Sequence, residues 1–266
     1  MLRYFLPLSF LLLSTAICFA QDKETLRQLP PEAVQLYPTL EDMEGYAVGQ
    51  YKDYLLIFGG SIRSKISDNN YQDFPNLDIL LIDFNENRAS AYTNGSYEGS
   101  LGEQISATGL SYYQNDGLLY LLGGYGYSET HNQFITFPYI TVINVKQTVL
   151  SLLNGMDPVA SFYQLCDDRM AVFDAEMDYN GDEFFLMNGK FAYKLRPFAD
   201  NPRYVEEKYN EEIRTFKISK DGAEWHLEHF ETWYDLEAFR EQYGTLIPER
   251  IEQQLQQLQQ SRNLSQ

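Results

Sequence analysis

The chain has 266 residues, a formal net charge of −18 and an apolar fraction of 44%. This length and apolar content exclude an intrinsically disordered protein and allow a domain with a substantial core. The excess of carboxylates excludes nucleic acid as a partner, because it repels phosphate backbones, and it opposes binding to anionic lipid headgroups. Aromatic residues make up 15% of the chain, which favours β-sheet, since pleated surfaces accommodate flat side chains.

The first twenty residues differ in character from the rest of the chain. Arg3 precedes a long apolar stretch, and small residues follow it. This order is typical of a secretory signal peptide over residues 1–20, cleaved after Ala20, and the stretch is too short for a membrane span. Lipidation after a cut before Cys18 is the alternative, which Ile17 disfavours because that peptidase prefers a small residue there. We therefore expect a secreted or periplasmic protein with no membrane insertion.

Cleavage would remove Cys18 and leave Cys166 as the single cysteine of the mature chain. Export permits disulfides, but one cysteine cannot form such a bond within the chain. Stability must therefore come from packing. Residues 21–43 are acidic and contain prolines, and we expect them to form an N-terminal arm that lies on the first structural unit.

From residue 44 onward, an apolar run that ends in a glycine doublet occurs three times. The doublets are Gly59-Gly60, Gly123-Gly124 and Asn188-Gly189. Their first members, at 59, 123 and 188, are 64 and then 65 residues apart. Asn replaces the first glycine of the third pair, and Asn tolerates a positive φ better than other residues with a side chain. A regular period indicates a repeat architecture.

Each repeat has the pattern of a four-stranded antiparallel unit. A strand-like segment precedes a tight polar turn, the run that ends in the doublet follows, and two further strands come after a longer loop. The turns at 116–117 and 180–181 are Asp-Gly and Asn-Gly, which are strong hairpin signals. In the second repeat the fourth strand is predicted at 147–155. Such a unit cannot bury both faces alone, so we expect the units to stack as blades of a β-propeller.

The unit resembles the kelch repeat: an apolar strand, a Gly-Gly doublet, a long loop, and a strand that ends near an acidic residue such as Asp83. The resemblance covers residues 44–231 and implies an all-β fold of kelch-like β-propeller blades, with three four-stranded antiparallel units in an incomplete ring. Kelch repeats usually carry Tyr and Trp after the doublet. Leu80 and Ala89 stand near those positions in the first unit, whereas the third unit keeps Trp225.

The second doublet continues as GGYGYSE, and a glycine-rich stretch of this kind could instead hold a phosphate. A dinucleotide site needs a helix directly after the glycines, because the helix N-terminal amides meet the pyrophosphate. The next ordered stretch is FPYITVINV, which is strand-like. We therefore expect the glycines to turn the chain.

Propeller topology places the second-to-third loops and the connections between blades on one face. Here these segments are long: 61–77, 125–138 and 190–211, with 94–104 and 152–166 between units. The first three of these segments together are rich in Arg and aromatic residues, as are protein hot spots and sugar-stacking sites. The alternative is that the aromatic residues only pack the long loops onto the blade edges. The predicted ligand-binding residues are Arg63, Tyr71, Tyr125, Tyr127, Tyr193, Arg196 and Arg203.

Candidate catalytic and metal sites fail on their spacing. DYNGDE at 178–183 resembles the start of a calcium loop, but Gly189 stands where a bidentate Glu is needed. His226 and His229 point to opposite faces of a strand. A kelch-type copper oxidase would need a His pair in addition to Cys166, and a kelch-like sialic acid isomerase would need a defined set of acidic and Arg groups. We therefore predict no catalytic residue, no metal and no cofactor.

Residues 232–266 are predicted to form a helical, Gln-rich C-terminal tail. One helix begins near Asp235 and ends at Gly244, and a second begins at Pro248. The second helix carries an apolar stripe that would pack on the propeller or on a second chain, and a frayed, Gln-rich tail is the alternative. The stripe consists of Ile251, Leu255 and Leu258.

Three blades do not close a ring, since propellers have about four to eight, and open ends invite strand pairing. A homodimer through the open blade edges, additional unseen blades, or truncation of a longer propeller would each account for this number. Truncation is favoured, because the tail after residue 243 does not resemble an end cap. The sequence thus predicts an exported, non-catalytic binding module for a protein or glycan ligand. The alternative is a sugar-modifying kelch-like enzyme of the isomerase or oxidase type, or a truncated, inactive remnant of one.

Overall fold

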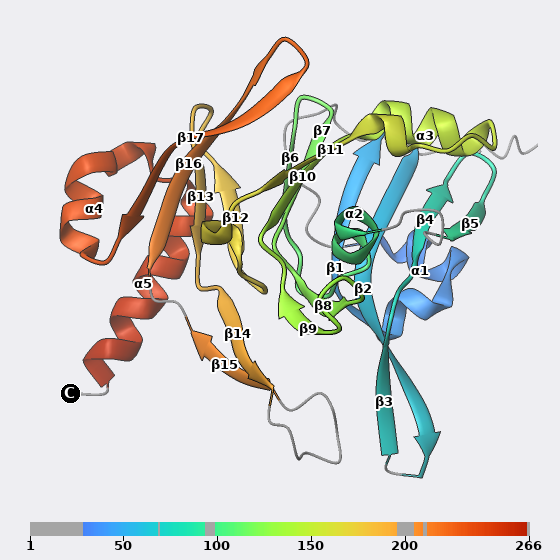
Figure 1. Cartoon of the computed structure of the whole chain (residues 1–266), viewed down its shortest axis with the longest axis horizontal. Coiled ribbons are helices and arrows are strands. Elements are labelled where there is room, and N and C mark those ends of the chain that lie inside the picture. Colours follow the sequence, from blue (N-terminus) through green and yellow to red (C-terminus); the bar gives the residue numbers. More distant parts are fainter. Residues whose placement is uncertain (1–28, 69, 94–98, 196–204, 210–211, 265–266) are drawn as a thin grey trace, which may run out of the picture.

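A computed structural model describes residues 29–68, 70–93, 99–195, 205–209 and 212–264. The predicted signal peptide lies outside these residues. In this part of the chain the strands form three antiparallel sheets that stand side by side, each with a ribbon of two strands below it (Figure 1). The predicted all-β fold class is confirmed. No helix in the described ranges is both long and apolar enough to span a membrane.

The first sheet has the strand order β1-β2-β4-β5, and β3 pairs with the distal half of β2. Two short helices precede it and pack on it, with Ala33 and Leu40 buried. The elements are α1 (Pro31–Leu36), the 3-10 helix η1 (Pro38–Asp42), β1 (Met43–Tyr51), β2 (Tyr54–Ser67), β3 (Asn70–Pro75), β4 (Asp78–Asp83) and β5 (Arg88–Thr93).

The second sheet has the order β6-β7-β10-β11. Its first hairpin turns at Asp116-Gly117, where both residues have positive φ, as the Asp-Gly sequence predicts. The elements are α2 (Ser100–Ile105), β6 (Ser111–Asn115), β7 (Leu118–Leu122), β8 (Tyr125–Ser128), β9 (Gln133–Thr136), β10 (Tyr139–Asn144), α3 (Val145–Leu153), the 3-10 helix η3 (Val159–Ser161) and β11 (Phe162–Cys166).

The third sheet has the order β12-β13-β16-β17, and two helices follow it. The elements are the 3-10 helix η4 (Asp168–Met170), β12 (Glu176–Tyr179), β13 (Phe184–Met187), β14 (Lys190–Leu195), β15 (Val205–Tyr209), β16 (Ile213–Asp221), β17 (Glu224–Trp233), α4 (Leu236–Tyr243), the 3-10 helix η5 (Gly244–Leu246) and α5 (Glu249–Leu264).

The fourth strand of the second sheet is not where the sequence predicted it. Residues 147–155 lie mostly in helix α3, and the strand is β11. The Asn144 side chain accepts a hydrogen bond from the Gln147 amide (3.0 Å) and so caps the helix start. Val145, Val149 and Leu152 lie one turn apart and are buried. The apolar residues of this segment follow a helical period, and this spacing outweighed the strand preference of its β-branched residues.

Alternating side chains bind each sheet to its neighbours. In β7, Leu119 and Leu121 belong to the core shared with the first sheet, whereas Tyr120 and Leu122 belong to the core shared with the third. Successive strand residues point to opposite faces, so the second sheet is buried on both sides. Its position explains why β7 is an uninterrupted apolar run.

At each glycine doublet the chain passes from the main sheet into a two-stranded ribbon. Gly59, Gly60, Gly123 and Gly124 all have positive φ, as does Asn188 (φ 60°), which supports the prediction that these positions bend the chain. They also approach the neighbouring unit closely. A Cβ on Gly59 would lie 2.2 Å from the Ala107 carbonyl oxygen, and one on Gly123 would lie 1.8 Å from that of Val172.

A ladder of backbone hydrogen bonds joins equivalent positions of successive units. The Gly109 amide donates to the Gly45 carbonyl, and the Asp174 amide donates to the Gly109 carbonyl, both at 2.8 Å. All three residues adopt positive φ. Positions 45, 109 and 174 follow the period of the doublets, so the repeat seen in the sequence is also the repeat of the contacts between units.

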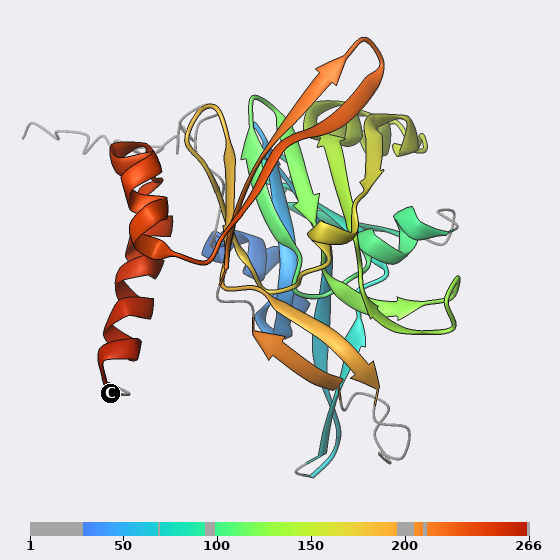
Figure 2. The same cartoon turned by 60° about the vertical axis from the view of Figure 1, so that its left-hand side comes forward.

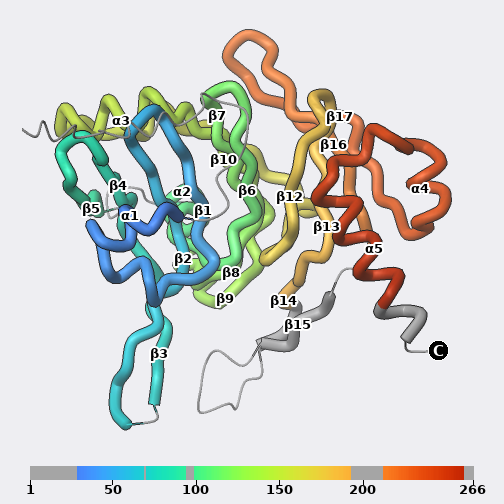
Figure 3. Tube along the Cα trace, turned by 180° about the vertical axis from the view of Figure 1, so that it is seen from behind, coloured from blue at the N-terminus to red at the C-terminus, as the bar shows by residue number. Residues whose placement is uncertain are grey.

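The C-terminal tail covers the free face of the third sheet, contrary to the expectation that it is not an end cap. Phe185 and Met187 of β13 share a buried cluster with both terminal helices. The predicted stripe of α5 packs within the same chain, with Ile251 and Leu255 buried. Asn188 Nδ2 donates to Gln254 Oε1 (2.9 Å). Helix α5 thus contacts the third doublet position, whereas the first two doublets contact the next unit. At the other end of the stack, α1 and η1 lie on the first sheet (Figure 3).

Replacing Gly123 by Ala should destabilise the protein more than replacing Gly117 by Ala. Both glycines have positive φ, but a Cβ at 117 meets open space. We expect Gly117→Ala to cost about 1–2 kcal/mol of backbone strain and Gly123→Ala a further ~1–3 kcal/mol of steric overlap. Urea unfolding monitored by circular dichroism measures both. Equal losses would contradict the close contact with Val172.

Truncation of Leu255 tests the cap. Leu255→Ala should lower the free energy of unfolding by about 2–5 kcal/mol because it opens a cavity between α5 and the third sheet. Gln257→Ala, at an exposed position of the same helix, should change it by less than ~0.5 kcal/mol. If both variants unfold at the same urea concentration, α5 does not contribute to the core.

Candidate binding face

The three segments predicted as long loops are β-ribbons, and all leave their sheets on one side (Figures 1 and 2). The first ribbon is the half of β2 beyond Gly60 with β3, the second is β8 with β9, and the third is β14 with β15. Ribbon pairing satisfies backbone groups that a loop would leave to water. The predicted loop 152–166 does not belong to this face, because α3 and η3 connect the third and fourth strands of the second sheet on the opposite side.

The first ribbon carries an exposed cation–aromatic pair. The Arg63 guanidinium lies over the Tyr71 ring, 5.0 Å from its centroid, and the Tyr71 side chain is 53% exposed. Every residue of β3 is exposed. Phe74, on the opposite face of the ribbon, is also exposed. The pair is therefore accessible to a ligand, and the packing alternative from the sequence does not apply to it.

Of the two predicted tyrosines on the second ribbon, Tyr125 packs against other rings and Tyr127 is exposed. The Tyr125 ring lies 5.8 Å from Phe134 and 5.3 Å from Phe173, centroid to centroid, so it joins the second unit to the third. Tyr127 contacts Phe134 edge-on at 5.4 Å, is 46% exposed, and donates its hydroxyl proton to Asn132 Oδ1 at 2.5 Å. Tyr125 is thus a packing residue, and Tyr127 remains a candidate contact.

Glu103 of α2 anchors the turn of the second ribbon, which the sequence analysis did not anticipate. Its carboxylate accepts hydrogen bonds from the Thr130 amide (3.0 Å) and hydroxyl (2.9 Å). Burial raises the pKa of Glu103, but the hydrogen bonds from Thr130 and Ser128 and the nearby His131 together bring that pKa below its ordinary value. The contact joins residues 27 positions apart, and no local sequence pattern signals it.

Ser128 and His131 do not form a nucleophilic pair. Ser128 Oγ lies 2.9 Å from His131 Nδ1, but the Ser128 side chain is fully buried. Its hydroxyl oxygen also accepts the His131 amide (3.2 Å). These are contacts within one turn, and a buried hydroxyl cannot attack a substrate in solvent.

The third ribbon lies against the second, and its predicted residues are only partly described. The Ala192 amide donates to Thr136 Oγ1 (2.9 Å), which links the two ribbons. Tyr193 belongs to β14, but its side chain, like Arg196 and Arg203, lies outside the described residues. The described candidates thus fall into two groups: the Arg63–Tyr71 pair on the first ribbon, and Tyr125 with Tyr127 on the second.

The metal candidates rejected from the sequence lie in a hairpin turn and on two strands. Asn180 Oδ1 accepts the amides of Asp182 (3.0 Å) and Glu183 (2.9 Å), so DYNGDE is the predicted hairpin turn. His226 and His229 lie on the edge strand β17, and Cys166 is exposed in β11. Among the described residues, no group of three or more His, Cys, Asp or Glu side chains could hold a metal ion.

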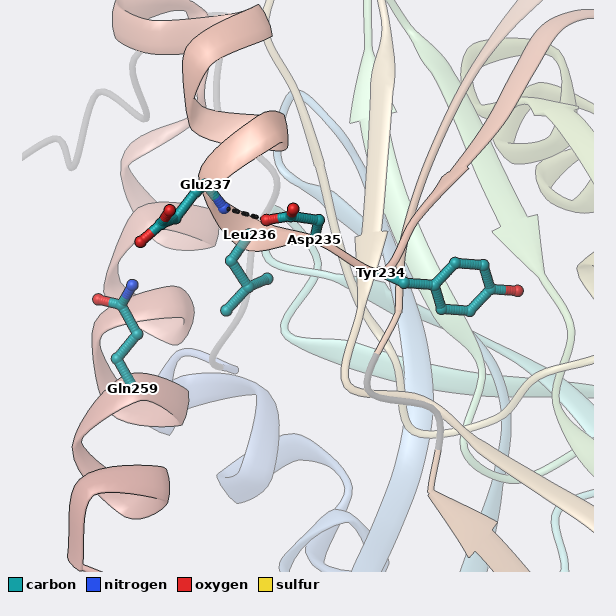
Figure 4. Close-up of a pocket in the computed structure, with 5 residues that line it drawn as sticks. All are labelled: Tyr234, Asp235, Leu236, Glu237 and Gln259. Atoms are coloured by element: carbon teal, nitrogen blue, oxygen red, sulfur yellow. Dashed lines mark hydrogen bonds between the residues drawn. The ribbon is translucent and has the colours of Figure 1, made fainter.

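A shallow hollow of about 460 Å³ lies away from the ribbons, at the C-terminal cap (Figure 4). Its lining is Tyr234, Asp235, Leu236, Glu237 and Gln259. Asp235 Oδ1 accepts the amides of Glu237 (2.9 Å) and Ala238 (3.3 Å) and so caps α4. The Tyr234 ring points away from the other lining residues (Figure 4). The hollow therefore brings together no groups suited to catalysis.

No protein-family model matches this chain, and no curated protein matches it.

The anchor at Glu103 predicts a pH dependence of the second ribbon. Because its pKa is lowered in the folded state, the stabilisation by the carboxylate is complete above the unfolded pKa of about 4.3. It is lost as the pH falls through the folded pKa. We expect the NMR shift of the Thr130 amide to titrate with a midpoint below that of an unstructured Glu.

The control variant for this titration is Glu129→Gln, which neutralises an exposed carboxylate in the same turn. It should leave the acid transition of the Thr130 amide in place, whereas Glu103→Gln should abolish it. A transition that survives Glu103→Gln would show that another group is responsible.

Proposed function

We propose that the protein is an exported, non-catalytic binding module built from three kelch-like β-propeller blades. Its ribbons would present aromatic and cationic groups to a protein or glycan ligand of the cell surface or periplasm. The observation that carries this proposal is the exposed Arg63–Tyr71 pair on a ribbon that leaves the sheets on the same side as Tyr127.

The blade assignment is supported by the order within each sheet. Each main sheet is a four-stranded antiparallel meander, and its first strand contacts the first strand of the next sheet. A doublet position ends the second strand or bends it in all three. Trp225, at the tryptophan position of the kelch pattern, packs edge-on against Tyr120 of the second sheet at 6.5 Å. In this proposal the terminal helices take the places of the missing neighbours, so three blades need not close a ring.

The binding assignment is supported by the chemistry of the ribbon side. Tyr71, Phe74 and Tyr127 are among the most exposed aromatic residues of the described chain, and Arg63 places a cation over one of the rings. Exposed rings with adjacent hydrogen-bonding groups suit stacking on sugars and anchoring of protein side chains. The backbones of the two ring-bearing ribbons are held by strand pairing, and the turn of the second is also held by Glu103, which limits the entropy lost on binding.

A ligand search followed by a double substitution tests this function. Labelled mature protein is screened on a glycan array and against a cell-surface protein fraction, and the ligand found is titrated by calorimetry. Tyr71→Ala combined with Tyr127→Ala should weaken binding at least about tenfold, equivalent to about 1.4 kcal/mol. The mass of the ligand should remain unchanged on incubation, whereas a sugar-modifying enzyme would convert it.

Tyr234→Ala is the matched control, because Tyr234 is 73% exposed at the C-terminal cap and belongs to neither of the two ring-bearing ribbons. This variant should bind with the affinity of the unmodified protein. Equal affinity of the ribbon variant and the control would refute the ribbon face as the binding surface.

A further inference from the structure

The connection between the third and fourth strands of the second sheet is longer than its counterparts. In the first and third sheets this connection is a tight turn, between Asp83 and Arg88 and between Asp221 and Glu224. In the second sheet it spans residues 145–161 and contains α3 and η3. This segment interrupts the repeat, and the repeat contacts described above do not require it.

Helix α3 is apolar on two sides. Its inner side is buried on the ends of the first and second sheets through Val145, Val149 and Leu152. Its outer side continues past the helix end as an exposed apolar stripe, whose side chains are between 36% and 57% exposed. The stripe consists of Leu150, Leu153, Met156 and Val159. A helix that only closes a connection would carry polar residues at these positions.

The segment carries little charge, although the protein is strongly acidic. The chain carries −18 overall, but residues 145–161 contain one basic residue, Lys146, and one acidic residue, Asp157. A second acidic copy can therefore approach here with little local repulsion. An anionic lipid surface would still meet the repulsion of the whole protein.

The two charges lie near opposite ends of the segment. Lys146, Leu150 and Leu153 follow a spacing of four and three residues, which places them on one side of the helix. Asp157 lies beyond the helix end, where its Oδ1 accepts the Val159 amide (2.9 Å). An antiparallel copy of the helix would bring Leu150 against Leu153, and it would place the helix start with Lys146 beside the segment that carries Asp157 of the partner subunit.

We propose that α3 and the segment to Val159 form the interface of a two-fold symmetric homodimer. The contact is isologous: each subunit supplies the same stripe, and the Lys146–Asp157 contact occurs twice. One short helix per subunit buries less than the roughly 800 Å² per partner of a standard interface, so the association is weak and depends on concentration. This interface differs from the open blade edges that the sequence suggested. The terminal helices pack on the outer faces of the first and third sheets.

The dimer would leave the ribbons free. Helix α3 and the ribbons lie on opposite sides of the sheets in Figures 1 and 2. Two copies joined through α3 would therefore point their ribbons in opposite directions, and a dimer could hold two ligands at once. The dimer itself does not depend on the binding function proposed above, and its test requires no ligand.

Sedimentation equilibrium of the mature protein at several concentrations is the test. About 0.15 M salt reduces the Debye length to about 8 Å and screens the repulsion between acidic copies. We expect the average mass to rise from monomer toward dimer. Lys146→Glu should weaken dimerisation at least tenfold, because it places two carboxylates together at both ends of the interface, and Asp157→Lys should do the same with two ammonium groups. An equimolar mixture of the two variants should associate again, since each contact then joins opposite charges.

Leu150→Glu should abolish dimerisation, whereas Leu246→Glu, at an exposed leucine of the C-terminal cap, should leave it unchanged. Thermal melts verify that all variants are folded. A protein that is monomeric at every concentration would overturn the proposal. The proposal would also fail if this monomer bound zwitterionic vesicles and Leu150→Glu abolished that binding, because the stripe would then be a lipid contact. Dimerisation of Lys146→Glu at the level of the unmodified protein would also overturn it.

Discussion

The fold depends on backbone-to-backbone contact between successive units at positions without room for a side chain. Amides and carbonyls of the units meet directly, as from Gly124 to Val172 and from Gly60 to Ala107, both at 2.8 Å. A side chain at Gly59 or Gly123 would overlap the neighbouring carbonyl. Close approach at this line of contacts sets the spacing of the sheets, and that spacing lets the side chains of β7 fill the cores on both of its faces.

A stack of sheets has two free faces, and this chain covers both with helices. The free face of the third sheet carries Phe185 and Met187, whose exposure would create an apolar patch. Helices α4 and α5 remove it, and the hydroxyl of Tyr243 donates to Thr215 Oγ1 (3.1 Å) below them. Burial is the main cause that raises the pKa of Tyr243 to about 12. Capped ends are the general solution of repeat proteins that do not close on themselves.

The two sides of the stack differ in kind. On one side, ribbons extend beyond the sheets and expose rings and an arginine, with their turns held by contacts such as Glu103 to Thr130. On the other side, the connections are tight turns except at α3, where the apolar outer stripe departs from the polar surface elsewhere. The two sides therefore offer different surfaces, and the binding and dimerisation proposals each rest on one of them.

The sequence by itself determined the repeat and the strands. The glycine doublets, the Asp-Gly turn and the apolar runs specify local backbone geometry, and the local pattern of α4, from Asp235 to Gly244, marks its ends. Tertiary structure decided what depends on distant partners. The segment at 147–155 is mostly helical because its apolar side packs on two sheets. The predicted loops are ribbons because their halves pair, and Tyr125 is a packing residue because Phe173 of the next unit meets it. Such contacts join residues far apart in the chain, so a local sequence pattern does not predict them.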